Sequence, residues 1–179
     1  MTCTDRRQFA SVVLLLFIFG CSLGLPLLRA DTTQTAQQNS SERTVIDNMQ
    51  TIMLLLRNHQ KIAFSVKLVH GGVRTTNTCE DPVVAKAIRQ HAADMKLRNE
   101  EGINVRPADP LFQELIRRHK EIKIRLVNIP DGVIEYETSS NPQVTLLIRA
   151  HTKTVSEFVR YGLPRAQEPS PLPKGYIGD

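Results

Sequence analysis

The chain is poor in aromatic residues and in cysteine, and each scarcity excludes something. It contains no tryptophan, three tyrosines and six phenylalanines among 179 residues, and no run of lysine or arginine. A nucleic-acid-binding surface is therefore not expected. Two of the three cysteines lie in the first 21 residues, which leaves Cys79 alone in the part that we expect to fold. A single cysteine cannot form an internal disulfide, so the domain must depend on its core.

Motifs that carry catalysis are also missing. The sequence has no glycine-rich phosphate loop, no Gly-x-Ser-x-Gly elbow, no His-Glu-x-x-His and no Cys-x-x-Cys-His. A catalytic thiol needs a base, and the residues around Cys79 supply none. We therefore favour a protein that binds over one that catalyses, and a hydrolase or redox enzyme using Cys79 is the weaker alternative.

Residues 1–30 have the pattern of a cleaved export signal. Arg6 and Arg7 form a charged start, an apolar stretch covers 12–28, and Ala30 is a small residue at the expected cleavage point. We predict an exported protein, periplasmic or secreted, with no integral membrane segment after cleavage. Cleavage would lower the formal charge from +5 to +3, because three of the 23 basic residues and one of the 18 acidic residues would leave.

Two variants of this export signal stay open. The pair Arg6-Arg7 resembles a twin-arginine signal, so the sequence does not decide between the Sec and twin-arginine routes. The segment that ends at Cys21 resembles a lipoprotein box, which gives lipid anchoring through Cys21 as the minority alternative.

An internal repeat of sixty residues is the strongest signal in the sequence. Segments 53–102 and 113–162 align without a gap, and thirteen of the fifty aligned positions are identical. The identical pairs are Leu55/Leu115, Arg57/Arg117, His59/His119, Ile62/Ile122, Gly72/Gly132, Val73/Val133, Thr78/Thr138, Pro82/Pro142, Val84/Val144, Ile88/Ile148, Arg89/Arg149, His91/His151 and Gly102/Gly162. We interpret this repeat as a tandem duplication.

Each copy predicts a helix, two strands and a second helix. Apolar residues recur at helical spacing and then alternate as in a strand, glycine marks the hairpin, and Asp-Pro or Asn-Pro opens the second helix. The repeats, 45–102 and 105–162, form one α+β domain over 45–162, with a mainly antiparallel four-stranded sheet and helices packed on it. Residues 31–44 are expected to be a polar tether, and the proline-rich residues 163–179 a disordered tail.

The paired histidines are the only indication of chemistry. On the longer helices, apolar stripes run through Val84, Ile88, His91 and Met95, and through Val144, Ile148, His151 and Val155. This spacing keeps His91 and His151 on the core-facing side, where they converge if the two helices pack side by side. Two neutral imidazoles suit a transition metal or non-covalent haem, with Met95 as a further metal ligand.

The alternative is a periplasmic partner-binding or structural module without a cofactor. A histidine on an apolar stripe also serves as a core residue bonded to a carbonyl, and duplication copies a structural histidine as readily as a ligand. His59 and His119 end the first helix of each copy, where we expect them to cap its carbonyls. Taking both hypotheses together, the partner is an unknown protein or a small cofactor, and the sequence names neither.

Overall fold

The computed structural model describes residues 48–178, so the expected signal at 1–30 and tether at 31–44 lie outside the described residues. The first described element is a helix over residues 48–57. The remaining elements are η1 (His59–Lys61), β1 (Ala63–Val69), β2 (Gly72–Thr78), α2 (Pro82–Glu101), α3 (Pro110–Arg117), η2 (His119–Glu121), β3 (Lys123–Ile129), β4 (Gly132–Thr138), α4 (Pro142–Tyr161) and α5 (Leu163–Ala166). Up to Tyr161 the second half of this order repeats the first, as the sequence predicts.

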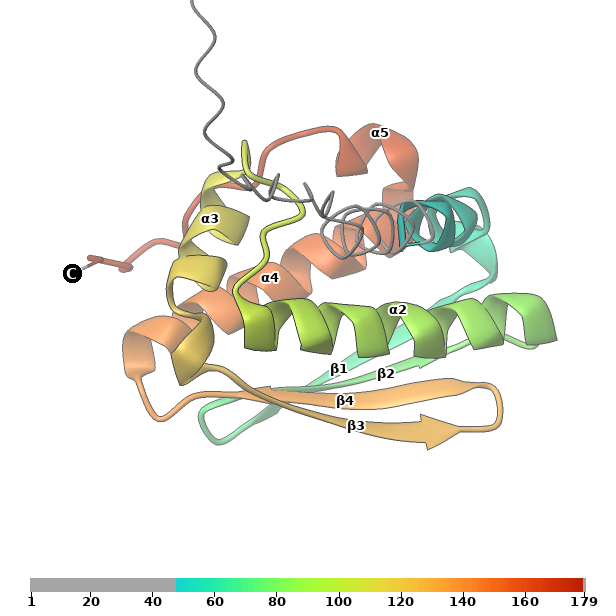
Figure 1. The fold of residues 1–179 in the computed structure, drawn as a ribbon, viewed down its shortest axis with the longest axis horizontal. Helices are drawn as coiled ribbons and strands as arrows, with labels where there is room; N and C mark the ends of the chain where they lie inside the picture. Colours follow the sequence, from blue (N-terminus) through green and yellow to red (C-terminus); the bar gives the residue numbers. More distant parts are fainter. Residues whose placement is uncertain (1–47, 179) are drawn as a thin grey trace, which may run out of the picture.

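The four strands form one antiparallel sheet in the order β1-β2-β4-β3. At its centre Gly72 pairs with Thr138, Thr75 with Glu135, and Thr78 with Gly132. Residues sixty positions apart thus occupy equivalent places about an approximate two-fold axis, which passes between Thr75 and Glu135. The predicted α+β class is confirmed (Figure 1). Duplication as the origin of the two halves stays an interpretation of the sequence.

The ends of the long helices follow from local chemistry. The side chain of Asp81 accepts hydrogen bonds from the backbone amides of Val83 and Val84 at the start of α2, and Asn141 accepts one at the start of α4. A proline at the first helical position needs no hydrogen-bond partner for its nitrogen. Gly102 ends α2 at a φ of 70°, a left-handed conformation that glycine adopts without strain.

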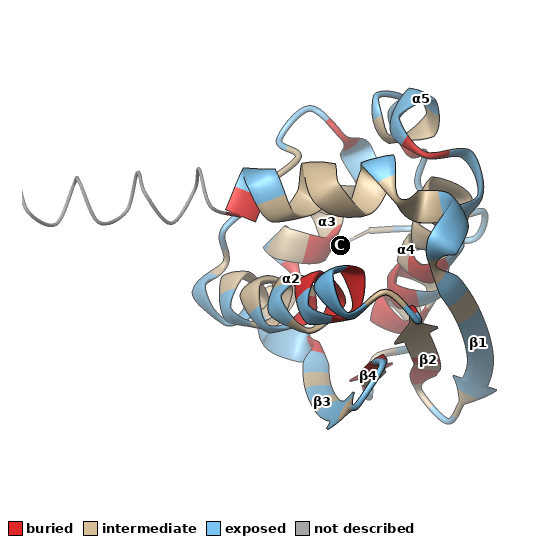
Figure 2. Ribbon diagram, turned by 90° about the vertical axis from the view of Figure 1, so that its right-hand side faces the viewer, coloured by how far each residue is buried: buried red, intermediate tan, exposed pale blue. Residues whose placement is uncertain are grey.

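The described helices lie on one side of the sheet (Figures 1 and 2). Each long helix packs on the strands of the other half. Helix α2 packs on β4 and β3, whereas α4 packs on β2 and β1. Accordingly, Val133 of β4 joins Val84 and Ile88 of α2 in one core cluster. Val73 of β2 joins Ile148 of α4 in the other. Each hairpin is therefore covered by the long helix of the opposite half.

The segment after Gly162 is not the disordered tail that its prolines predict. Its first residues form α5, and Arg106 donates hydrogen bonds to the carbonyl oxygens of Ala166 and Glu168 at 2.6 and 3.0 Å. Further along, Ser170 is fully buried and its amide donates to Asp109 at 2.9 Å. Proline prevents regular structure, but it does not prevent an irregular segment from packing when buried polar partners accept its backbone groups.

No described helix is both long enough and apolar enough to span a bilayer. The apolar stretch at 12–28 lies outside the described residues.

Candidate functional site

Two glutamates of β4 occupy the polar centre of the molecule, between the sheet and the long helices. Glu135 and Glu137 alternate with their neighbours, so they point to the same side as Val133, which is fully buried under the helices. Glu137 is only 8% exposed. Burial raises the pKa of Glu135 well above its ordinary value, and the charge of Glu137 raises it further. The surroundings of Glu135 thus favour its neutral form over its charged form.

His151 of α4 reaches this centre and contacts Glu137. Its Nδ1 lies 3.5 Å from Oε2 of Glu137, and the edge of Phe112 meets its ring at a centroid distance of 5.2 Å. Burial lowers the pKa of His151, but the Glu137 contact and the charge of Asp109 outweigh it, so the net pKa is raised. With 23% of its side chain exposed, His151 is an ion-pair partner of Glu137 inside the domain.

His91 of α2 has the opposite electrostatic environment. Burial lowers its pKa to about 4, with smaller contributions from the charges of Arg98 and His151. The imidazole of His91 is therefore neutral at physiological pH. The two histidines hold equivalent positions on the long helices, yet their pKa values shift in opposite directions. Copy two carries Glu135 and Glu137 where copy one carries Thr75 and Asn77.

A metal centre built on His91, His151 and Met95 does not receive support from this arrangement. In the part of the chain that the structure describes, no group of three or more histidine, cysteine, aspartate or glutamate side chains is placed to hold a metal ion. Met95 lies one turn after His91 and is half-buried. Any metal bound here would have the two imidazoles as its main ligands.

His59 and His119 do cap helices, but not the helices that the sequence analysis names. Nδ1 of His59 lies 2.8 Å from the carbonyl oxygen of Val159, and Nδ1 of His119 lies 2.7 Å from that of Asn99. Each histidine thus bonds the end of the long helix of the opposite half. The expectation of a cap on the preceding helix is wrong because the halves cross, which brings a different set of free carbonyls to the ring.

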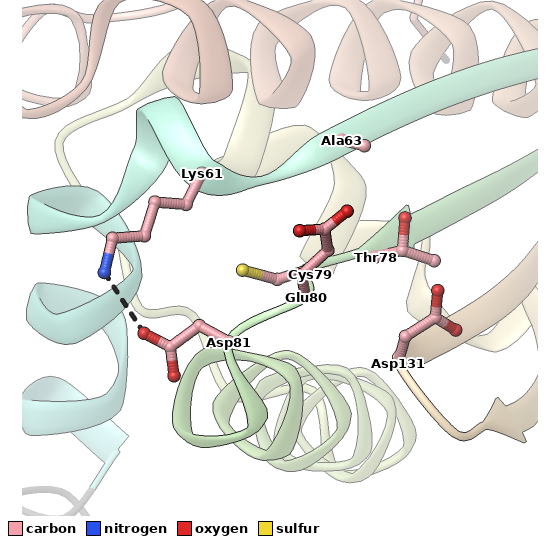
Figure 3. A pocket seen from close by; sticks show the side chains of 7 residues that line it. All are labelled: Lys61, Ala63, Thr78, Cys79, Glu80, Asp81 and Asp131. Atoms are coloured by element: carbon pink, nitrogen blue, oxygen red, sulfur yellow. Dashed lines mark hydrogen bonds and ion pairs between the residues drawn. The ribbon is translucent and has the colours of Figure 1, made fainter.

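Cys79 lines an open pocket of about 570 Å³ at the amino-terminal end of α2. Figure 3 shows the thiol directed into the space flanked by Lys61 and Asp81, whose Nζ and Oδ2 atoms are 3.1 Å apart. The thiol is 5% exposed and forms no disulfide. Among the described residues that line the pocket there is no histidine, so the thiol has no imidazole base beside it.

The outer side of the sheet, which we call the open face, has no described helix against it (Figure 2). Because side chains alternate between the two sides of a strand, the basic and acidic strand residues lie on opposite sides of the sheet. Every cationic strand residue points to the open face, and both acidic strand residues point to the helices. The cationic residues are Lys67, Arg74, Lys123 and Arg125.

Four open-face residues line up in a single row across the sheet, which we call the cationic row. Lys67 pairs with Arg74, Arg74 with Tyr136, and Tyr136 with Arg125, so the row crosses all four strands. The guanidinium carbon of Arg125 lies 3.8 Å from the centroid of the Tyr136 ring, and that of Arg74 lies 5.9 Å from it. Hydrogen bonds from Arg74 and then Arg125 lower the pKa of the Tyr136 hydroxyl. The ring therefore holds two guanidinium groups at the surface.

Sequence analysis missed both the glutamate pair and the cationic row. The alternation of β4 places Glu135 and Glu137 on the same side of the strand as Val133, an apolar residue that is identical in both copies, so this signal was available in the sequence. The cationic row depends on the order of the strands in the sheet. Lys67, Arg74 and Arg125 are scattered along the chain, and only the register aligns them.

Comparison of the chain with models of known protein families, with curated proteins and with solved structures found no match.

Proposed function

We propose that the protein is a non-enzymatic binding domain that holds an acidic partner on the open face of its sheet. The observation that carries this proposal is the cationic row, in which Lys67, Arg74 and Arg125 lie on one surface with no acidic strand residue among them. Arginine is suited to this role because its planar guanidinium forms paired hydrogen bonds with carboxylate, sulfate or phosphate oxygens.

A sequence difference between the two halves also supports the open face as the binding surface. The four pairs of equivalent open-face positions at the middle of the strands, Ser65/Arg125, Lys67/Val127, Arg74/Ile134 and Thr76/Tyr136, all differ between the halves. Tyr136 stands where the first half has Thr76, and Arg125 where it has Ser65. By contrast, Val73 and Val133 are identical and buried. The row that is equivalent to the cationic row by the two-fold axis, Ser65, Thr76, Ile134 and Val127, carries no charge, so the open face has its cations in one row only.

We propose in addition that the domain acts after export, in the periplasm or outside the cell, as the sequence pattern of residues 1–30 indicates. The measurement is the mass of the protein recovered from the exported fraction. An amino terminus near Asp31 supports this location, and an intact Met1 or a lipid on Cys21 contradicts it.

The proposed surface can be located with a small anion. We expect pyrophosphate, titrated into isotopically labelled protein, to shift the amide NMR signals of Arg74, Arg125 and Tyr136 more than those of the helices. Arg74→Ala and Arg125→Ala should each weaken this response several-fold. Lys86→Ala and Lys153→Ala remove the same charge from exposed positions on α2 and α4 and serve as matched controls. Shifts that follow the control lysines, or no shift on the open face, would reject the proposal.

A second candidate function, a cofactor site on His91 and His151, keeps one supporting observation. The charge of His151 contributes to the low pKa of His91, so the two rings are close enough to interact. Metal analysis and an absorbance spectrum of the purified protein test it directly. A stoichiometric metal or a haem Soret band that disappears in both His91→Ala and His151→Ala would support this candidate, and its persistence in either variant would reject it.

A further inference from the structure

We propose that the occupant of the open face is a linear polyanion that lies across the strands along the cationic row and is recognised by its charges alone. This inference rests on the proposed function and names the chemical class of its ligand: a polymer that carries repeated phosphate, sulfate or carboxylate groups. It follows from the length of the cationic row, from the geometry around Tyr136 and from the charges at the far end of the sheet.

The length of the cationic row exceeds the reach of one anionic group. Neighbouring strands are about 4.8 Å apart, so the backbones of Lys67 and Arg125, at opposite edges of the sheet, are separated by about 14 Å. Lys67 and Arg74 pair directly at one end, and Arg125 stands at the other. A single phosphate or carboxylate can reach the two guanidinium groups that share the Tyr136 hydroxyl, but it cannot also neutralise Lys67 at the edge of the sheet. Several anionic groups on one chain are needed to neutralise the whole row.

The surroundings of Tyr136 indicate which kind of polymer this is. Proteins that read single-stranded nucleic acid on an open sheet stack bases on exposed aromatic rings. Here the guanidinium groups of Arg125 and Arg74, at 3.8 and 5.9 Å from the centroid, occupy the neighbourhood of the Tyr136 ring. The ring positions the two cations and is not left free to stack on a base. Recognition is thus expected to depend on charge and not on base identity.

The orientation of the polymer follows from the rest of the open face. The next row along the strands, which contains Thr76 and Ile134, carries no charge. Beyond it, at the far end of the sheet, Asp131 lies in the turn before β4 and Glu80 follows β2, and both are exposed. A polyanion aligned with the strands would contact the cationic row at one point only and would then cross the uncharged row toward an end where Lys61 and Arg89 lie beside these carboxylates. A polyanion aligned across the strands stays on the cationic row.

The test compares affinities for anions of increasing length, measured by calorimetry on the full domain. The probes are pyrophosphate, long-chain polyphosphate, a sulfated polysaccharide and polygalacturonate, which together separate length from the type of anionic group. We expect at least one long polymer to bind tenfold or more tightly than pyrophosphate. The slope of log affinity against log salt should fall by about 0.7 to 1 for each of Lys67→Ala, Arg74→Ala and Arg125→Ala. The control variants Lys86→Ala and Lys153→Ala should leave it unchanged.

Three results would overturn this inference. If pyrophosphate shifts the open-face NMR signals but no polymer binds more tightly, the polymer is wrong and the proposed function stands. If neither pyrophosphate nor any polymer shifts those signals, the proposed function fails as well. If oligothymidylate binds tenfold more tightly than an abasic strand of equal length, bases are read and recognition by charge alone is wrong. Circular dichroism of each variant, whose changes are on the surface, checks that the fold is retained.

Discussion

The imidazole of His59 binds the carbonyl oxygen of Val159, one hundred residues further along the chain, at 2.8 Å. The equivalent contact, from His119 to Asn99, measures 2.7 Å. In each case the ring also lies against the glycine that ends the long helix, Gly162 or Gly102. The turn before the first strand of one half thereby fixes the carboxyl end of the long helix of the other half.

Replacement of Gly162 by alanine tests this contact. An added Cβ would lie 2.7 Å from the His59 ring, and the φ of 68° strains any residue with a side chain. We expect Gly162→Ala to lower the free energy of unfolding by about 2 to 3 kcal/mol. Gly175→Ala is the control, because its φ of 84° also disfavours a side chain but no atom lies within 4 Å of the new Cβ.

A double-mutant cycle separates the backbone strain at Gly162 from the clash of the new Cβ with the His59 ring. In the background of His59→Ala, Gly162→Ala should be milder by about 1 kcal/mol, since the ring that it meets is gone. The measurement is urea denaturation of the two single variants and the double variant. Simple additivity would mean that His59 does not contact Gly162 in solution.

Acid should destabilise the protein through His91. Its pKa in the folded state is about 4, below the ordinary value of 6.5, so the unfolded chain binds a proton first as the pH falls. The stability that neutral His91 contributes is present above pH 6.5 and is lost between pH 6.5 and 4, by up to about 3 kcal/mol. Denaturation between pH 7 and 4 should show this loss, and His91→Gln should flatten it. An NMR titration that finds a His91 pKa near 6.5 would contradict the assignment.

His151 should depend on pH in the opposite direction. The contact with Glu137 helps to raise its pKa, so its contribution to stability is present below pH 6.5 and is lost as the pH rises through the folded pKa. Glu137→Gln removes the charge, and we expect the NMR-detected pKa of His151 to fall, because a nearby opposite charge is lost. Glu80→Gln, a change at an exposed carboxylate, should not move it.

Glu135→Gln should stabilise the protein at neutral pH. Because burial and Glu137 raise the pKa of Glu135, its contribution to stability is present below the ordinary pKa of 4.5 and lost as the pH rises. A neutral amide removes this loss, which we expect to raise the free energy of unfolding at pH 7 by about 1 kcal/mol and to change it less at pH 4. Equal effects at both pH values would contradict a raised pKa of Glu135.

Asp109 should prove important for both stability and the carboxyl-terminal segment. It is 3% exposed, accepts hydrogen bonds from the amides of Leu111 and Ser170, and pairs with Arg106 at 3.1 Å. Asp109→Ala loses the cap of α3 and leaves buried donors unpaired, so we expect a loss of about 2 to 4 kcal/mol. Hydrogen exchange at the Ser170 amide should increase more than at Val133, and unchanged protection at Ser170 would contradict the contact.

The elements and the fold class could be predicted because their signals are local. Asp81 before Pro82 and Gly102 after the apolar stripe mark the ends of α2 wherever that helix packs. The crossing of the helices has no such signal. The apolar side of α2, with Val84 and Ile88, could pack on its own hairpin or on the other hairpin equally well. The sequence of the helix does not distinguish these two arrangements.

The candidate site could be predicted only in part for the same reason. His91 and His151 lie on the long helices where the periodicity places them, but their environments differ because of Thr75 and Glu135, which belong to strands. A helical periodicity does not report which strand residues lie beneath it. The order of residues 163–178 was also beyond prediction, because the buried partners of Ser170 lie sixty residues earlier in the chain.

The crossing of α2 and α4 determines which pieces of this protein can exist alone. If the chain were cut between Gly102 and Asp109, the first piece would contain β1 and β2 without α4, and α2 without β3 and β4. Each of these elements would lack the partner that it packs on in the intact domain. The second piece would have the same two exposed surfaces, each complementary to one on the first. The two separate pieces should therefore bind each other when mixed. One piece alone should form a dimer with a second copy of itself. In the intact chain, the linker over residues 103–108 keeps the two halves together, so their association takes place within one molecule during folding.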